Sequence, residues 1–243
     1  MIHNDFCGFA LYLCYFLLAA SLALAVRRFF NIPPELMRKL LHMIITLSVF
    51  PLLYLFQSWV SAVLAMLFFS GAVYPVLTLA ERDARYGALF SQRRAGEVKT
   101  SLLLVFGMFA VLTAVFWGGM KEGGKCVIVV AVMAWGFGDA AAALIGKAFG
   151  KRVIRHPRVE GKKTLEGTLA MFLVSLLAVF FTTLRLTALP WYLCAAVALM
   201  VAPVCAVVEL FSRKGMDTVT VPLAAAFCFW AAMSLFALME GAA

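Results

Sequence analysis

Hydrophobic residues occur along this chain in long blocks that are separated by short polar segments. Each block is long enough, as a helix, to cross about 30 Å of hydrocarbon. Pro51 interrupts the second block, which is otherwise apolar from Leu40 to Phe56. The pattern predicts an all-α protein, a polytopic membrane helix bundle that forms a single integral membrane domain over residues 1–243. The eight predicted spans cover residues 6–26, 37–56, 59–80, 102–119, 126–146, 167–188, 191–210 and 221–239.

The composition is that of a membrane protein and excludes a disordered chain. Of the 243 residues, 65% are hydrophobic and 14% are charged, whereas a soluble domain is about half apolar and a quarter charged. The first block is preceded by Asp5 and by no Lys or Arg, which favours a retained span over a cleaved signal peptide. The six cysteines form no C-x-x-C pair, so neither a zinc site nor a disulfide framework is expected.

Positive charge is distributed unevenly between the two sides of the predicted bundle. The segments that follow spans one, three, five and seven hold 18 of the 21 Lys and Arg residues, and the other side holds only Lys121, Lys125 and Arg185. Lys and Arg concentrate in cytoplasmic loops. We therefore expect both termini outside, the large loops in the cytoplasm, and a location in the inner cell membrane.

One acidic residue lies deep in a predicted span. Asp139 is flanked by glycines and alanines and precedes Lys147 by eight residues, which places it about 12 Å along the helix from the cytoplasmic surface. Ionisable residues inside hydrocarbon are costly and usually mark functional sites. A structural hydrogen bond within the bundle is the alternative, because small neighbours also allow helices to approach closely.

The most basic loop of the chain joins spans five and six. Positive-inside topology and contact with anionic lipid explain much of its charge. Lys162 and Lys163 differ, because they directly precede a helix for which Thr164 is the expected N-cap. Backbone N–H groups, the helix dipole and two ammonium groups together form a seat for polyphosphate. The loop holds Lys147, Lys151, Arg152, Arg155, Arg158, Lys162 and Lys163, and Glu166 lies in the first turn of the helix that follows.

Other costly polar residues are predicted at the same cytoplasmic depth. Arg38 and His42 share a helix face with Lys39 beside them, and Glu97, Glu209 and Asp217 lie at membrane boundaries. Each acid is either a surface charge or a contact for a metal or hydroxyl group. Polar groups at one depth favour a metal-assisted phosphate site open to a charged cytosolic substrate over a permeation path through the full bilayer.

Four motifs, in chain order, resemble the CTP-dependent lipid-alcohol kinases, the family that includes phytol kinase, dolichol kinase and the CTP-using diacylglycerol kinase. They are R-K-L-L-H (38–42), G-D-A-A-A-A-L-I-G-K-A-F-G-K (138–151), G-K-K-T-L-E-G-T-L-A (161–170) and D-T-V-T-V-P (217–222). Thr218 departs from the family, which commonly has Asn there. Phosphatidate cytidylyltransferases are similar over the same centre, but their C-terminal G-H-G-G and D-R-x-D signature is missing.

The resemblance implies a membrane kinase that transfers the γ-phosphate of CTP to the hydroxyl of a polyprenol, phytol, geranylgeraniol or diacylglycerol. Asp139 would then bind Mg²⁺, assisted by Glu209 or Asp217, and His42 or a carboxylate such as Glu166 would take the hydroxyl proton. Glu97 is a further candidate. The residues expected to bind the triphosphate are Arg38, Lys39, Lys147, Lys151, Lys162, Lys163 and Thr164.

Two other functions remain open from the sequence. One is a CTP-dependent cytidylyltransferase that acts on a lipid phosphate, and the other is a non-catalytic transporter or lipid-binding membrane protein. The expected partners are CTP, a membrane lipid alcohol and the phospholipid bilayer, with no nucleic acid. A homodimer is also left open.

Overall fold

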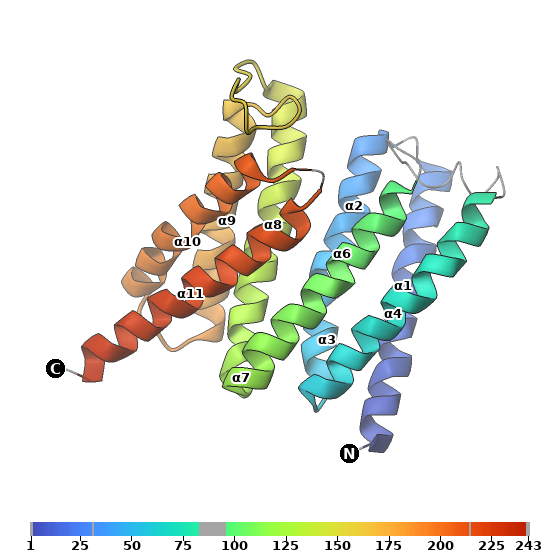
Figure 1. The fold of residues 1–243 in the computed structure, drawn as a ribbon, viewed down its shortest axis with the longest axis horizontal. Helices are drawn as coiled ribbons and strands as arrows, with labels where there is room; N and C mark the ends of the chain where they lie inside the picture. The colour runs from blue at the N-terminus through green and yellow to red at the C-terminus, as the bar shows by residue number, and fades with distance from the viewer. Residues whose placement is uncertain (1, 31, 83–95, 214, 242–243) are drawn as a thin grey trace. The chain divides into compact units, whose positions relative to one another are not determined.

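The computed structural model describes residues 2–30, 32–82, 96–213 and 215–241. These residues form helices and connecting segments, and among them the only β-type pairing is one isolated bridge between Val153 and Thr164 (Figure 1). Eight described helical segments are long and apolar enough to cross a membrane, which confirms the predicted all-α class and number of spans. The chain divides into two compact units, residues 1–119 and 120–243.

The first unit is built from helices that share an aromatic core. Phe69 stacks on Phe106 with ring centroids 5.8 Å apart, and Phe16 contacts these two rings at 5.6 and 5.9 Å. Burial of such rings is the main source of core stability. The helices are α1 (Ile2–Phe29), α2 (Pro34–Leu47), α3 (Val49–Leu55), α4 (Trp59–Arg82) and α6 (Glu97–Leu112), and the chain continues through the π-helical turn η1 (Thr113–Trp117) and the short α7 (Gly118–Met120).

Ser48 divides the second predicted span into α2 and α3. Pro51 has no N–H, and its ring excludes a helical carbonyl four residues earlier, which accounts for a break at this place. The Tyr15 hydroxyl donates to the Ile44 carbonyl at 2.6 Å, and the Tyr12 hydroxyl donates to the Ser48 hydroxyl at 3.2 Å. Helix α1 therefore supplies hydrogen bonds to the polar groups at the break, as an apolar environment requires.

The second unit contains α8 (Glu122–Phe149), α9 (Leu165–Leu186), α10 (Trp191–Phe211) and α11 (Asp217–Gly241). Helix α8 contacts the other three helices and packs most extensively against α9. Helix α11 begins four residues before the predicted span. Gly215, with φ +78°, provides the left-handed turn that only glycine adopts without strain, and the helix starts two residues later.

Small residues let α8 and α9 approach closely. A Cβ added at Gly138 would lie 2.3 Å from Ser175 Oγ and 2.6 Å from Met171 Sδ. The Ser175 hydroxyl donates to the Ala134 carbonyl at 2.9 Å, so the contact is both close and hydrogen-bonded. This is the close packing expected of small residues in membrane helices, and it fixes the part of α8 that carries Asp139.

Candidate functional site

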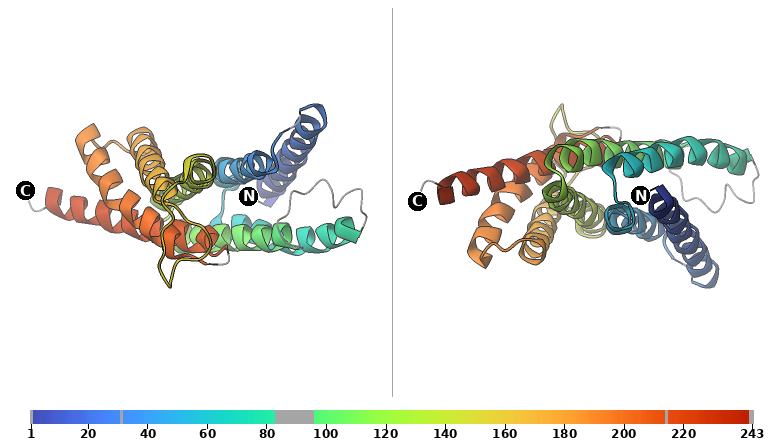
Figure 2. Two further views of the ribbon diagram at one scale, coloured as in Figure 1. Left: turned by 90° about the horizontal axis from the view of Figure 1, so that it is seen from above. Right: turned by 90° about the horizontal axis from the view of Figure 1, so that it is seen from below.

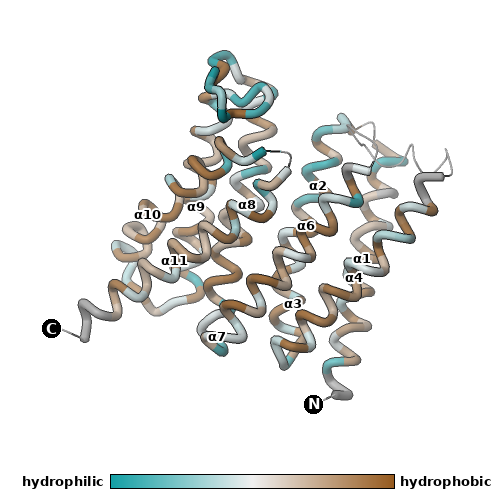
Figure 3. Tube along the Cα trace, in the orientation of Figure 1, coloured by the Kyte–Doolittle hydropathy of each residue, from teal (hydrophilic) through white to brown (hydrophobic). Residues whose placement is uncertain are grey.

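The basic loop between α8 and α9 folds back on itself. The Ile154 N–H donates to the Lys163 carbonyl and the Leu165 N–H donates to the Arg152 carbonyl, both at 2.9 Å. Figures 1 and 2 show this loop at one end of α8 and α9, and Figure 3 shows it as the hydrophilic end of that helix pair. Lys147 in the last turn of α8, and Lys151 and Lys162 in the loop, are exposed.

Thr164 is the N-cap of α9, as the sequence predicted. Its hydroxyl oxygen accepts from the Gly167 N–H at 3.2 Å, and the residue is buried. A Cβ added at Gly150 would lie 2.8 Å from the Thr164 hydroxyl and 2.1 Å from the Gly146 carbonyl oxygen. The cap is therefore enclosed by glycines, and its hydroxyl satisfies one of the helix donors that would otherwise lack a partner.

Glu166 turns back towards the basic loop. Both of its carboxylate oxygens lie 3.3 Å from the Arg152 backbone nitrogen, which donates to them. This carboxylate in the first turn of α9 also lies at the positive end of the helix dipole. Glu166 thus helps to fold the loop. The proton-accepting role that the sequence suggested for it stays a prediction.

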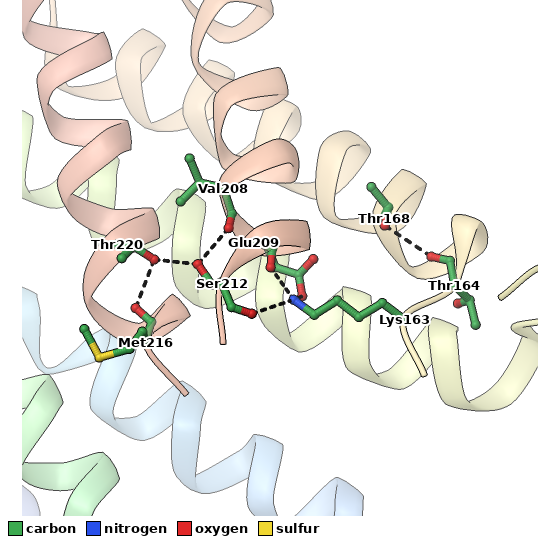
Figure 4. Close-up of polar contacts among 8 residues, drawn as sticks. All are labelled: Lys163, Thr164, Thr168, Val208, Glu209, Ser212, Met216 and Thr220. Atoms are coloured by element: carbon green, nitrogen blue, oxygen red, sulfur yellow. Dashed lines mark hydrogen bonds and ion pairs between the residues drawn. The ribbon is translucent and has the colours of Figure 1, made fainter. Parts of the chain in front are cut away.

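Lys163 and Glu209, to which the sequence analysis assigned different roles, form an ion pair. Lys163 Nζ lies 2.9 Å from Glu209 Oε1, and it also donates to the backbone carbonyl of Glu209 (Figure 4). A further contact of 3.5 Å joins Nζ to the Ser212 carbonyl. The two side chains are largely shielded, with 21% and 12% of their surfaces exposed. The ammonium therefore satisfies carbonyls at the C-terminus of α10 and neutralises the buried carboxylate.

A second contact joins the loop to the turn after α10. Arg213 donates from Nε to the Arg158 carbonyl at 3.1 Å and from Nη2 to the Pro157 carbonyl at 2.9 Å. Sequence reasoning missed this residue, because an Arg in a short cationic turn has no local signature that indicates its partner. Lys163 reaches from the loop to α10, and Arg213 reaches from the turn after α10 to the loop. Together the two residues hold the loop against the end of α10.

Asp139 is half-buried on α8, between the buried residues Gly138 and Ala140. It takes part in an interaction within the described structure. Asp217 is the first residue of α11 and is also half-buried. Both carboxylates are thus partly accessible, as a ligand for a soluble substrate or cation has to be.

The remaining candidates belong to the first unit. Arg38 forms an i,i+3 ion pair with Glu35 on α2. Lys39 is buried, with 6% of its surface exposed, and His42 is half-buried. Glu97 is the first residue of α6. A buried lysine near the start of a membrane helix is costly, which is consistent with a role beyond solubility for the 38–42 motif.

The side chains near the proposed site can be compared with the ligands that a magnesium ion requires. Among the described residues, no group of three or more His, Cys, Asp or Glu side chains is placed to bind a metal. Asp139, Glu209 and Asp217 therefore do not form a three-ligand site in this structure. Mg²⁺ is usually bound by one or two carboxylates together with substrate phosphates and water, so the donor chemistry of a single carboxylate beside a phosphate seat still fits it.

The helices and the loop define a polytopic membrane protein with a cationic site on a closely packed helix pair. The chain belongs to the cytidylyltransferase family, which matches residues 5–211. It is 33% identical over 215 residues to a phytol kinase from Synechocystis sp. PCC 6803, and this match covers 84% of the chain and 82% of that protein. No solved structure matches the chain. The family and the relative confirm the resemblance to the CTP-dependent lipid-alcohol kinases.

Proposed function

We propose that this protein is a membrane kinase that transfers the γ-phosphate of CTP to the hydroxyl of a lipid alcohol. The observation that carries the proposal is the cationic loop folded over the capped N-terminus of α9, on the same helix pair as Asp139. A helix N-terminus with adjacent ammonium groups binds anionic phosphate. The basic loop, the cap and the half-buried acid together suit a nucleotide whose phosphates must be neutralised.

Similarity to known proteins supports a kinase in preference to a nucleotidyl transferase. The relative is a phytol kinase, and the R-K-L-L-H and D-T-V-T-V-P segments follow the kinase pattern. The C-terminal signature of the phosphatidate cytidylyltransferases is missing. An isoprenoid alcohol such as phytol, geranylgeraniol or a polyprenol is the first substrate to test, followed by diacylglycerol.

In this proposal the loop binds and orients the triphosphate. Lys147, Lys151 and Lys162 supply exposed ammonium groups. The Lys163 ammonium is paired with Glu209 and donates to the Glu209 and Ser212 carbonyls, so it would bind phosphate only by giving up one of these acceptors. Arg38 and Lys39 are proposed as further phosphate contacts.

Asp139 is the proposed magnesium ligand, and Glu209 and Asp217 are candidates to assist it. When bound, Mg²⁺ would neutralise the charge that develops on the phosphates. His42 or Glu166 is proposed to accept the proton of the attacking hydroxyl, since both types of side chain serve as general bases near neutral pH. The lipid alcohol would reach the site laterally from the bilayer.

Parallel reactions with CTP labelled at the α- or γ-phosphate test this function. Purified full-length protein with Mg²⁺ would be offered phytol, geranylgeraniol, a long polyprenol, diacylglycerol and phosphatidate. Transfer of γ label to an alcohol is the expected result and names the substrate. Transfer of α label to phosphatidate would establish a cytidylyltransferase instead. A folded, nucleotide-binding protein that labels no lipid would contradict both enzyme assignments, and flux in liposomes would then identify a transporter.

A further inference from the structure

An open cavity of about 370 Å³ lies beside the basic loop, and its described lining residues are not among those proposed to act in the kinase reaction. The described residues that line it are Arg158 from the loop, Phe211 at the end of α10, and Arg213 just after it. The volume is within the range of roughly 300–1,000 Å³ that is typical of small-molecule sites. All three described lining residues belong to the second unit.

Contacts within the unit hold the walls of this cavity in place. Arg213 is fixed by its bonds to the Pro157 and Arg158 carbonyls, which use two of the five guanidinium N–H donors. The His156 ring meets the Phe211 ring edge-on, with centroids 5.7 Å apart. The Arg158 N–H in turn donates to His156 Nδ1 at 3.1 Å. The loop wall and the α10 wall are therefore joined by both aromatic and polar contacts.

The charge of the lining indicates an anionic ligand. Two guanidinium groups and one aromatic ring line the cavity, and the described lining includes no acid. Guanidinium groups recognise phosphate with paired hydrogen bonds, more specifically than ammonium groups do. A phosphate group is therefore the chemistry that this cavity fits.

The position of the cavity indicates where that phosphate comes from. Phe211 is the last residue of the apolar α10 and has 43% of its surface exposed, and Arg213 follows two residues later. Exposed aromatic rings next to cationic side chains at the end of a spanning helix lie at the depth of lipid headgroups. We propose that this cavity binds the phosphate of an anionic phospholipid headgroup, and that bound lipid braces the loop against α10.

Arg158→Gln is the most informative variant. It removes one guanidinium but keeps the backbone carbonyl that accepts from Arg213, so the contact between loop and turn is retained. Arg155→Gln is the matched control, because Arg155 is an exposed arginine of the same loop and does not line the cavity. Arg158→Lys is a second variant that keeps the charge and loses the paired geometry.

The experiment measures binding of fluorescent phosphatidylglycerol to the purified full chain in detergent, with equally labelled phosphatidylcholine as the neutral lipid. We expect preference for phosphatidylglycerol, a loss of affinity of about fivefold in Arg158→Gln, and less than about twofold in Arg155→Gln. Equal affinity for the two lipids would overturn the proposal, and so would equal losses in the two variants. If Arg158→Gln lost affinity for CTP and kept its affinity for phosphatidylglycerol, the cavity would be assigned to the nucleotide instead. The lipid measurement needs no turnover, so it fails or succeeds independently of the kinase assignment.

Discussion

Lys163 Nζ lies 2.9 Å from Glu209 Oε1, in a pair that joins the basic loop to the C-terminus of α10. Because both side chains are largely shielded, loss of either one leaves a charge in a poorly solvated place. The pair also anchors the residue directly before the N-cap of α9 to the end of α10. It therefore connects the stability of the second unit with the proposed phosphate seat.

The first prediction concerns this pair. Lys163→Met and Glu209→Gln should each lower thermal stability in detergent, and the double variant should lose less than the sum of the two. The expected coupling energy is about 0.5–3 kcal/mol. Unfolding midpoints of the four proteins measure it. Strictly additive losses would show that the two side chains do not stabilise each other in the folded protein.

The second prediction concerns Asp139. Asp139→Asn keeps the shape of the side chain and removes its charge, so we expect transfer from CTP to fall by about 100-fold or more, with little change in unfolding midpoint. Initial rates with γ-labelled CTP at saturating Mg²⁺ measure the effect. Substantial residual activity would remove Asp139 from the proposed metal-binding role.

The third prediction concerns the N-cap of α9. Thr164→Ala removes the hydroxyl that accepts from the Gly167 N–H, and loss of such a cap costs about 1 kcal/mol. Thr164→Ser keeps the hydroxyl and is the matched control. We expect a lower unfolding midpoint and weaker CTP binding in Thr164→Ala, and smaller changes in Thr164→Ser. Equal unfolding midpoints and equal CTP affinities in the two variants would contradict the cap assignment.

The fourth prediction compares two glycines of α8. A Cβ at Gly138 would collide with Ser175 and Met171, whereas a Cβ at Gly123 would have no heavy atom within 4 Å. Gly138→Ala should lower the free energy of unfolding by about 1–3 kcal/mol, which is the usual cost of overpacking. Gly123→Ala should be neutral or stabilising, because alanine favours helix by up to about 1 kcal/mol. Unfolding midpoints distinguish the two, and similar values would argue against close α8–α9 packing at Gly138.

Sequence rules that act over a few residues predicted local features well. The Thr164 cap is a side-chain hydrogen bond to the amide of a residue three positions away. Pro51 indicates the break between α2 and α3, because its ring excludes the helical carbonyl four residues earlier. Gly215 shows where such rules were incomplete, because its left-handed turn starts α11 at Asp217, ahead of the apolar block. Hydropathy indicates which part of a helix is apolar. The residue at which the helix begins depends on the turn that precedes it.

The sequence by itself determined the helical class, the number of spans, the basic loop and the candidate residues, because each depends on composition or on short spacing. Only the tertiary structure decided the partners: Lys163 with Glu209, 46 residues apart, and Arg213 with Pro157, 56 residues apart. Helices that face lipid are apolar all round, so their sequences do not indicate which face meets a neighbour or in what register. Those contacts depend on how side chains of separate helices fit together, and a linear pattern does not encode that fit.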